Sequence, residues 1–165
     1  MGRHHSRVLQ ASSRVLYVGG VEIAGSPCAI EGERVYPSLD VLLAESADID
    51  FAVIALPTGM HSEASVALAK EGVNLLIEKP LALTHAEGSS IIEACEQGRI
   101  HAAVGHVERY NPALVKMKQL LASGSLGRPT ALITERTGPA PRGLRDVGVI
   151  NDLVGIPRVI AAERL

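Results

Sequence analysis

Three short polar clusters in this sequence each follow a run of apolar residues, and the sharpest of them is Glu78-Lys79-Pro80. A lysine at the end of a buried strand can lose its water, which lowers its pKa and lets it act as an acid or base near neutral pH. Glu78 can hold the charge and orient the amine. Pro80 restricts Lys79 to extended backbone angles, or places it in a tight turn if the bond is cis. The alternative interpretation is a surface Glu–Lys pair before a proline that opens the next segment. The other two clusters are Pro57-Thr58-Gly59-Met60-His61 and the run from His106 to Pro112.

Each cluster is expected at the carboxyl end of a buried strand. Residues 51–56 are a continuous apolar run, which is typical of a parallel strand covered on both faces. Residues 73–77 predict another buried strand, and residues 100–105 predict a third strand. In such a sheet, ligands bind at the carboxyl ends of the strands. A single polar strand end is usually only a solvated loop, but three in one sheet favour a functional site.

Helices and strands are expected to alternate along the chain. Apolar periodicity and end signals predict helices at residues 3–13, 39–45 after an N-cap at Ser38, 60–71, 84–97 between Thr84 and the stop residue Gly98, and a further helix opened by Asn111-Pro112. Further strands are expected at residues 14–23 and about 130–137, and loops at 24–34 and 138–148. This rhythm predicts the α/β class, with a Rossmann-like doubly wound parallel sheet.

Composition excludes several classes of protein. The 165 residues carry 16 basic and 18 acidic side chains, a net charge of −2, and only 2% aromatic residues, so no nucleic-acid partner and no anionic membrane surface are expected. No apolar run could span a membrane, and no signal-peptide core follows the first residues, so a cytoplasmic protein is expected. Cys28 and Cys95 lie far apart and in no C-x-x-C arrangement, so no metal site is expected.

The runs that contain the three clusters resemble a known family. Residues 53–88, VIALPTGMHSEASVALAKEGVNLLIEKPLALTHAEG, together with 105–129 and 145–153, are similar to the glucose–fructose oxidoreductase and inositol dehydrogenase (Gfo/Idh/MocA) family. The motif that carries the resemblance is E-K-P, downstream of P-T-x-x-H. The resemblance implies an NAD(P)-dependent oxidoreductase that transfers a hydride from a ring carbinol of a sugar to the nicotinamide.

A narrower resemblance concerns the substrate. The runs GHVERYNPA and RDVGV look like those of the 3-dehydrogenases of UDP-N-acetylhexosamines or their uronic acids. The implied partner is therefore a sugar or a UDP-sugar, and the implied coenzyme is NAD, with NADP as the alternative.

The resemblance also assigns roles residue by residue. Lys79 would move the proton of the sugar hydroxyl, and Asp152 matches the Asp of a downstream D-x-x-x-H motif, so these two are the candidate catalytic residues. Glu22 follows Gly2 by twenty residues at a strand end, which suits the acidic residue that binds the adenosine ribose and favours NAD over NADP; a solvated glutamate is the alternative. The candidate coenzyme-binding residues are Gly2, Arg3, Glu22, Pro57, Thr58, His61, Glu78 and Lys79, and the candidate substrate-binding residues are His106, Arg109, Tyr110 and Asn111.

Both ends of the chain depart from the family pattern. Met1-Gly2-Arg3 looks like the end of a G-x-G-x-x-G motif, so the first strand and two glycines are expected to be missing. Residues 14–21 are then a candidate for the empty central position of the sheet. A separate glycine-rich turn after them is the rival, although its spacing is not G-x-G-x-x-G. At the other end, Ile156 stands where the downstream motif requires His.

These departures lead us to expect a partial gene product. The expected domains are an incomplete dinucleotide-binding domain at residues 1–127 and only the start of a C-terminal α/β sheet domain at 128–165. Activity of such a chain is open, and the alternative is a non-catalytic nucleotide- or sugar-binding module or a degenerate α/β fragment. A homo-oligomer is also left open, because most of the sheet that usually forms the interface is expected to be absent.

Overall fold

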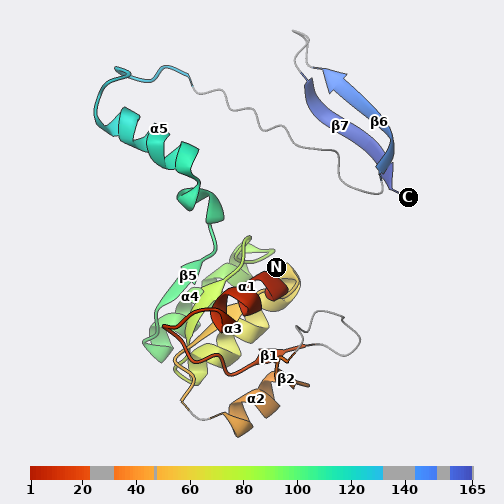
Figure 1. The fold of residues 1–165 in the computed structure, drawn as a ribbon, viewed down its shortest axis with the longest axis vertical. Coiled ribbons are helices and arrows are strands. Elements are labelled where there is room, and N and C mark those ends of the chain that lie inside the picture. The colour runs from red at the N-terminus through yellow and green to blue at the C-terminus, as the bar shows by residue number, and fades with distance from the viewer. Residues whose placement is uncertain (23–31, 47, 132–143, 152–156, 165) are drawn as a thin grey trace. The chain divides into compact units, whose positions relative to one another are not determined.

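The computed structural model describes residues 1–22, 32–46, 48–131, 144–151 and 157–164. Contacts divide the chain into two units, Met1–Lys116 and Met117–Leu165. The domain boundary expected between residues 127 and 128 stays a prediction. From residue 39 on, helices and parallel strands alternate in the first unit as the sequence predicts (Figure 1). Before it, two short strands follow one another within the described residues, and the second, Val35–Tyr36, was not predicted.

A three-stranded parallel sheet forms the centre of the first unit. Its strands are β3 (Phe51–Ile54), β4 (Asn74–Ile77) and β5 (Ala102–Val104), in the order β3-β4-β5. Ile54 lies opposite Ile77, which in turn lies opposite Val104. These are the three expected strands, each slightly shorter than expected. The register brings their carboxyl ends to the same edge of the sheet.

Two crossover helices cover this sheet and close its core. α3 (His61–Lys70) connects β3 to β4, and α4 (His85–Gly98) connects β4 to β5; the two helices pack against each other. Their apolar faces meet the apolar strands, as burial of a nearly continuous Val/Ile/Leu sheet requires. The buried core consists of Ile54, Leu68, Val73, Leu75, Ile77 and Ile91.

A second, smaller sheet lies between two helices in the sequence. α1 (Gly2–Gln10) precedes β1 (Gly20–Val21), and β1 pairs in parallel with β2 (Val35–Tyr36), which α2 (Leu39–Glu45) follows. The strand expected at residues 14–23 is wrong for 14–19, which form no ladder and leave Leu16 92% exposed. The reason is that a strand needs a partner, and β2 offers only two residues.

The two sheets together follow the Rossmann strand order. In the general Rossmann order 3-2-1-4-5-6, removal of strand 1 leaves the parallel pair 3-2 and the parallel group 4-5-6. In this chain the pair β2-β1 corresponds to 3-2, and the sheet β3-β4-β5 corresponds to 4-5-6. Within the described residues no strand joins the two sheets, so residues 14–21 do not occupy the central position. The doubly wound α/β fold is confirmed.

A capping box starts α4. The Thr84 hydroxyl accepts a hydrogen bond from the Glu87 amide at 3.2 Å, and the Glu87 carboxylate accepts one from the Thr84 amide at 3.1 Å. Thr84→Ala is expected to lower the free energy of unfolding by about 1 kcal/mol, because it leaves an N-terminal amide without its acceptor. Urea unfolding measures the loss. Thr84→Ser keeps the hydroxyl and is the control; an equal loss in both variants would contradict the capping explanation.

The end of α4 differs from the prediction. Gly98 is the last helical residue, and Arg99, with φ of 52°, takes the left-handed conformation that usually falls to glycine at a C-terminus. Gly98 has another use: a Cβ there would overlap the carbonyl group of Ala69 in α3. The glycine therefore lets two helices approach closely, which the local sequence did not reveal.

α5 (Pro112–Ala122) begins in the first unit, and the second unit contains its end and an antiparallel hairpin. The hairpin pairs β6 (Leu144–Asn151) with β7 (Pro157–Arg164), with Ile150 opposite Val159. The loop expected at 138–148 is therefore wrong for residues 144–148, because residues 157–164 supply a pairing partner. The strand expected at about 130–137 lies, from residue 132 on, outside the described residues.

Candidate functional site

The carboxyl ends of the three central strands meet, as the sequence predicts. The amide of Glu78 donates to the Ile54 carbonyl at 2.9 Å, and the amide of Gly105 donates to the Ile77 carbonyl at 2.7 Å. Glu78 thus lies between the ends of β3 and β5, one residue beyond β4. The three polar clusters leave the sheet at one edge.

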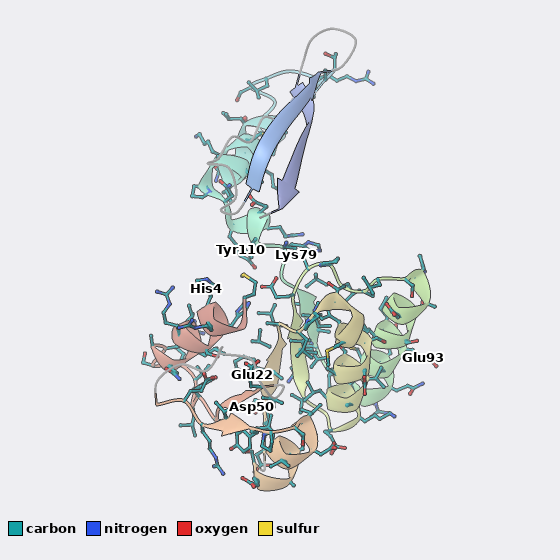
Figure 2. The ribbon with its side chains drawn as sticks, turned by 90° about the vertical axis from the view of Figure 1, so that its right-hand side faces the viewer. His4, Glu22, Asp50, Lys79, Glu93 and Tyr110 are labelled. Carbon is teal, nitrogen blue, oxygen red and sulfur yellow. The ribbon has the colours of Figure 1, made fainter. Side chains whose placement is uncertain are left out.

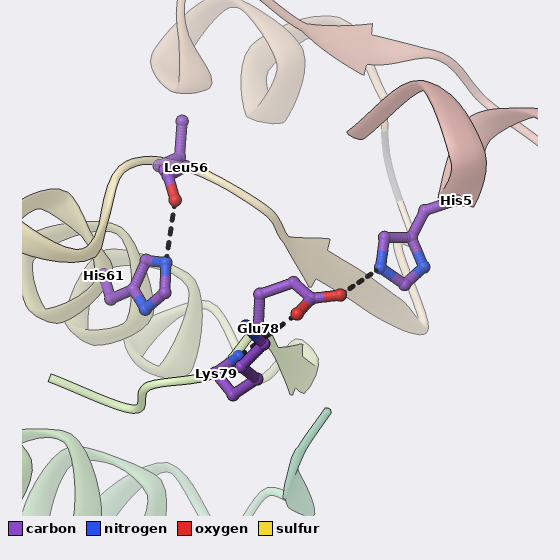
Figure 3. A network of polar contacts seen from close by, with 5 residues as sticks. All are labelled: His5, Leu56, His61, Glu78 and Lys79. Carbon is purple, nitrogen blue, oxygen red and sulfur yellow. Dashed lines mark hydrogen bonds and ion pairs between the residues drawn. The ribbon is translucent and has the colours of Figure 1, made fainter. Parts of the chain in front are cut away.

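The Glu78 carboxylate is the buried centre of this edge, with the residue only 5% exposed. His5 Nε2 donates to its Oε1 at 2.8 Å, and the Lys79 amide donates to its Oε2 at 3.2 Å (Figure 3). The hydrogen bond from His5 is the main cause that lowers the pKa of Glu78, in spite of burial, and the Lys79 amide and the nearby charges add to the effect. Glu78 is therefore an ionised, oriented acceptor.

Lys79 is exposed, in contrast to Glu78. The Lys79–Pro80 peptide bond is cis. The sequence predicts a lysine that the strand end alone desolvates, and the exposed side chain of Lys79 does not agree with this. The alternative, a surface Glu–Lys pair, does not agree either, because Glu78 is buried. What Glu78 holds is the backbone of Lys79, and among the described residues the Lys79 amine has no hydrogen-bond or ion-pair partner, so it can face solvent or a ligand.

His61, the first residue of α3, joins two of the strand-end loops. It is 1% exposed; its Nε2 lies 2.9 Å from the Leu56 carbonyl, and its Nδ1 lies 3.1 Å from the Pro80 carbonyl and 3.3 Å from that of Leu81. Carbonyl oxygens only accept hydrogen bonds. A neutral imidazole ring has one N–H and can donate on one side only, whereas a doubly protonated ring can donate on both sides. His61 therefore connects the loop after β3 with the turn that contains Lys79.

The rest of the first cluster forms a single turn of 3₁₀ helix, Thr58–Met60, before α3. The Met60 amide donates to the Pro57 carbonyl at 2.8 Å and closes the turn. Thr58 is half-buried and Pro57 is exposed. This turn displays both residues at the same edge as Lys79, which leaves their expected coenzyme contacts as a proposal.

The N-terminal helix brings a further part of the chain to this edge through the contact between His5 and Glu78. Gly2 is the first residue of α1, and Arg3 is exposed. Glu22 follows β1 directly (Figure 2), and its amide donates to the Tyr36 carbonyl at 3.2 Å. Glu22 therefore follows a parallel strand directly, as expected, and α1 begins one residue before the helix predicted at 3–13 and ends three residues before the predicted end.

The third cluster continues from β5 as another 3₁₀ turn, Val107–Tyr110. His106 and Arg109 are exposed, and Tyr110 is 83% exposed. Asn111 is occupied locally: its Oδ1 accepts from the Ala113 amide at 3.0 Å and its Nδ2 donates to Glu108 at 3.0 Å. In the described chain, no hydrogen bond or ion pair joins Arg109 or Tyr110 to the Lys79 turn.

Two further expectations concern Asp152 and metal binding. Asp152 lies outside the described residues. In the part of the chain that the structure describes, no three His, Cys, Asp or Glu side chains gather as metal ligands. The helices of that part also lack the length and apolar composition needed to cross a bilayer.

The comparison with protein families accounts for this arrangement. Residues 2–106 match the sequence profile of the "Oxidoreductase family, NAD-binding Rossmann fold". The chain belongs to the Gfo/Idh/MocA family. The match covers α1, both parallel sheets and the Glu78-Lys79-Pro80 turn, so the resemblance seen in the sequence is confirmed.

Curated relatives of this family member include sugar and sugar-nucleotide dehydrogenases. UDP-N-acetylglucosamine 3-dehydrogenase of Acidithiobacillus ferrooxidans is 34% identical over 93% of this chain and 48% of its own length. Inositol 2-dehydrogenase 2 of Saccharopolyspora erythraea is 33% identical over 91% of this chain and 46% of its own length. The chain thus spans about half the length of the curated relatives it matches.

Solved structures agree on the fold. The WlbA dehydrogenase of Bordetella pertussis, crystallised with NADH and UDP-GlcNAcA, is 30% identical over 59% of this chain and 28% of that chain, with a TM-score of 0.54. An NAD-binding protein from Listeria innocua, 22% identical with a TM-score of 0.69 over 78% of this chain and 39% of that chain, supports the fold alone.

His5 is the site residue that sequence reasoning missed. It lies in an N-terminal run, Met1-Gly2-Arg3-His4-His5, in which only Gly2 and Arg3 are predicted as site residues. Its helical position, three residues after Gly2 and thus on the same face, was the available signal. The contact with Glu78, 73 residues away, became visible only in the folded chain.

Proposed function

We propose that this chain is the coenzyme-binding part of an NAD-dependent dehydrogenase that oxidises a ring hydroxyl of a sugar nucleotide. The single observation that carries the proposal is the Glu78-Lys79-Pro80 turn: a buried, oriented carboxylate holds the backbone of a lysine whose amine remains free. UDP-N-acetylhexosamines and their uronic acids are the proposed substrates. They are supported by the names of the relatives and by the run from residue 105 to 113.

The residues present fit the coenzyme. α1 starts without a side-chain cap and without an acidic residue in its first turn, so its first amides suit an anionic group such as a pyrophosphate. Glu22 at the end of β1 offers a carboxylate for ribose hydroxyls. When bound, NAD supplies the hydride acceptor.

Lys79 is proposed to do the proton chemistry. As the neutral amine, its Nζ accepts the proton of the sugar hydroxyl while a hydride moves from the ring carbon that bears this hydroxyl to the coenzyme. Nζ then passes the proton to water. Bound coenzyme and sugar would cover the exposed amine and withdraw its water, which favours its neutral form. Pro57, Thr58, His61 and Glu78 are proposed on the coenzyme side, and His106, Arg109, Tyr110 and Asn111 on the sugar side.

Other parts of the proposal concern the whole protein. Asp152 is kept as a second candidate catalytic residue, and residues 128–165 as the start of the substrate domain. A cytoplasmic location belongs to the same proposal, and the oligomeric state of the whole protein is left open.

The test is a titration of the chain with NADH, followed by the fluorescence of the coenzyme, with and without UDP-N-acetylglucosamine. We expect saturable binding that the sugar nucleotide strengthens. Absence of binding at millimolar NADH would reject the proposal for this chain. Binding of NADH, together with no NADH formation when NAD⁺ and the sugar nucleotide are supplied in a separate assay, would instead support the non-catalytic binding module.

Glu22 is expected to decide between the two nicotinamide coenzymes. Its carboxylate would bond to the ribose hydroxyls of NADH and repel the extra phosphate of NADPH, so NADH should bind at least about tenfold more tightly. Glu22→Ala is expected to bring the two dissociation constants close together. Glu63→Ala, which removes an exposed carboxylate from α3, is the matched control and should leave the ratio unchanged. An unaltered ratio in Glu22→Ala would contradict this role.

A further inference from the structure

His5 is a residue to which neither the family resemblance nor the proposed function gives a task. We infer that His5 is a positioning residue, whose ring N–H holds the Glu78 carboxylate in one orientation behind the Lys79 turn. This inference rests on the proposed function, because it concerns the lysine assigned to proton transfer there. It adds a second element, α1, to the support of that lysine.

The first step of the argument is the need of Glu78 for partners. A glutamate side chain that is 7% exposed has lost most of its water, and a buried charge is stable only when donors replace that water. Two donors do so, one on each oxygen: His5 Nε2 at 2.8 Å and the Lys79 amide at 3.2 Å. The shorter bond comes from the ring, which is also the leading cause of the lowered pKa of Glu78.

The second step is the geometry of the two bonds. Because Oε1 is held by α1 and Oε2 by the backbone of Lys79, the carboxylate group cannot rotate without breaking one of them (Figure 3). Gly105 lies beside the carboxylate: even a Cβ on it would come only to an ordinary contact distance, 3.5 Å, from the Glu78 carboxyl carbon. Loss of the His5 donor therefore frees the carboxylate and loosens its hold on Lys79.

The third step is that α1 has its own anchor. The hydroxyl of Ser6, the residue after His5, lies 2.9 Å from the Tyr17 hydroxyl and can donate to it, while the Tyr17 hydroxyl gives its one proton to Glu33. Removal of the His5 side chain thus leaves α1 attached. This separation lets an experiment distinguish a positioning role from general support of the fold.

The experiment compares three variants of the full chain. His5→Phe keeps a ring but has no donor, His5→Gln restores an amide donor at the position of Nε2, and His4→Ala changes the exposed neighbour as the matched control. The first measurement is the titration of the Glu78 carboxyl by carbon-13 NMR. The second is NADH affinity together with kcat and KM for the UDP-sugar.

We expect His5→Phe to raise the pKa of Glu78 towards its ordinary value and to lower kcat about tenfold, with KM for the sugar nearly unchanged. His5→Gln should recover most of both effects, and His4→Ala should show neither. A Glu78 titration that is the same in His5→Phe as in the wild type overturns the inference and leaves the proposed function standing. A shifted titration with unchanged kcat and NADH affinity overturns the positioning role.

The two proposals fail in different ways. If the wild-type chain binds no NADH, the proposed function fails, and the positioning of a catalytic lysine fails with it. The carboxyl titration remains a separate measurement, because it reads the bond between His5 and Glu78 without coenzyme or substrate.

Discussion

Replacement of Lys79 by alanine is expected to lower turnover roughly a hundredfold or more, since a positioned acid or base contributes on the order of 10² to 10⁴ in rate. The amine is exposed, and the hydrogen bond from this residue to Glu78 comes from its backbone amide, which alanine keeps. The loss should therefore appear in kcat, while NADH affinity and thermal stability stay close to those of the wild type. The measurement is NADH formation with a UDP-N-acetylhexosamine, beside a coenzyme titration and a melting curve.

The matched control for Lys79→Ala is Lys70→Ala, which removes an exposed lysine at the end of α3, away from the strand-end edge. It should leave turnover unchanged. If Lys79→Ala keeps turnover within about threefold of the wild type, the proton-transfer role is wrong. If it instead lowers the melting temperature strongly, the lysine is structural.

Replacement of His61 by alanine is expected to lower the free energy of unfolding by about 3 kcal/mol. The substitution removes the buried ring that faces the carbonyls of Leu56, Pro80 and Leu81, so it removes their hydrogen-bond donor and leaves an empty space. Urea unfolding measures this loss. The two loops it joins carry Thr58 and Lys79, so coenzyme affinity should fall with stability.

The control for His61→Ala is His85→Ala, which changes an exposed histidine in α4 and should alter stability by at most about 0.5 kcal/mol. His61→Gln retains an amide donor and is expected to lose less than His61→Ala; it also provides a measurement if the alanine variant does not fold. A loss below about 1 kcal/mol in His61→Ala would contradict its role as a clamp between the two loops.

Local sequence was enough to predict the strands and helices from residue 39 to 122. Apolar runs that end in polar clusters indicate buried parallel strands, and Ser38 and Thr84 both act as the N-caps that their types predict. The meeting of the three strand ends also followed, because parallel neighbours in such a fold end at one edge. The family resemblance added the coenzyme and the kind of substrate to this frame.

Other features depend on partners that are distant in the sequence. Residues 14–19 have strand composition but no ladder, whereas residues 144–148 have loop composition and join β6, because residues 157–164 pair with them. Gly98 looked like a helix stop, but its lack of a side chain serves the contact with Ala69. In each case the conformation depends on the segment that packs against or pairs with these residues.

The sequence by itself determined the α/β class, the family and the cluster around Lys79. These depend on residue types and short spacings, which act over one helical turn or one strand. Only the tertiary structure decided that Glu78 is buried while Lys79 is exposed, that His61 joins two loops, and that His5 reaches Glu78. Burial and hydrogen bonding between residues 20 or 73 positions apart arise when separate elements pack, so no local pattern records them.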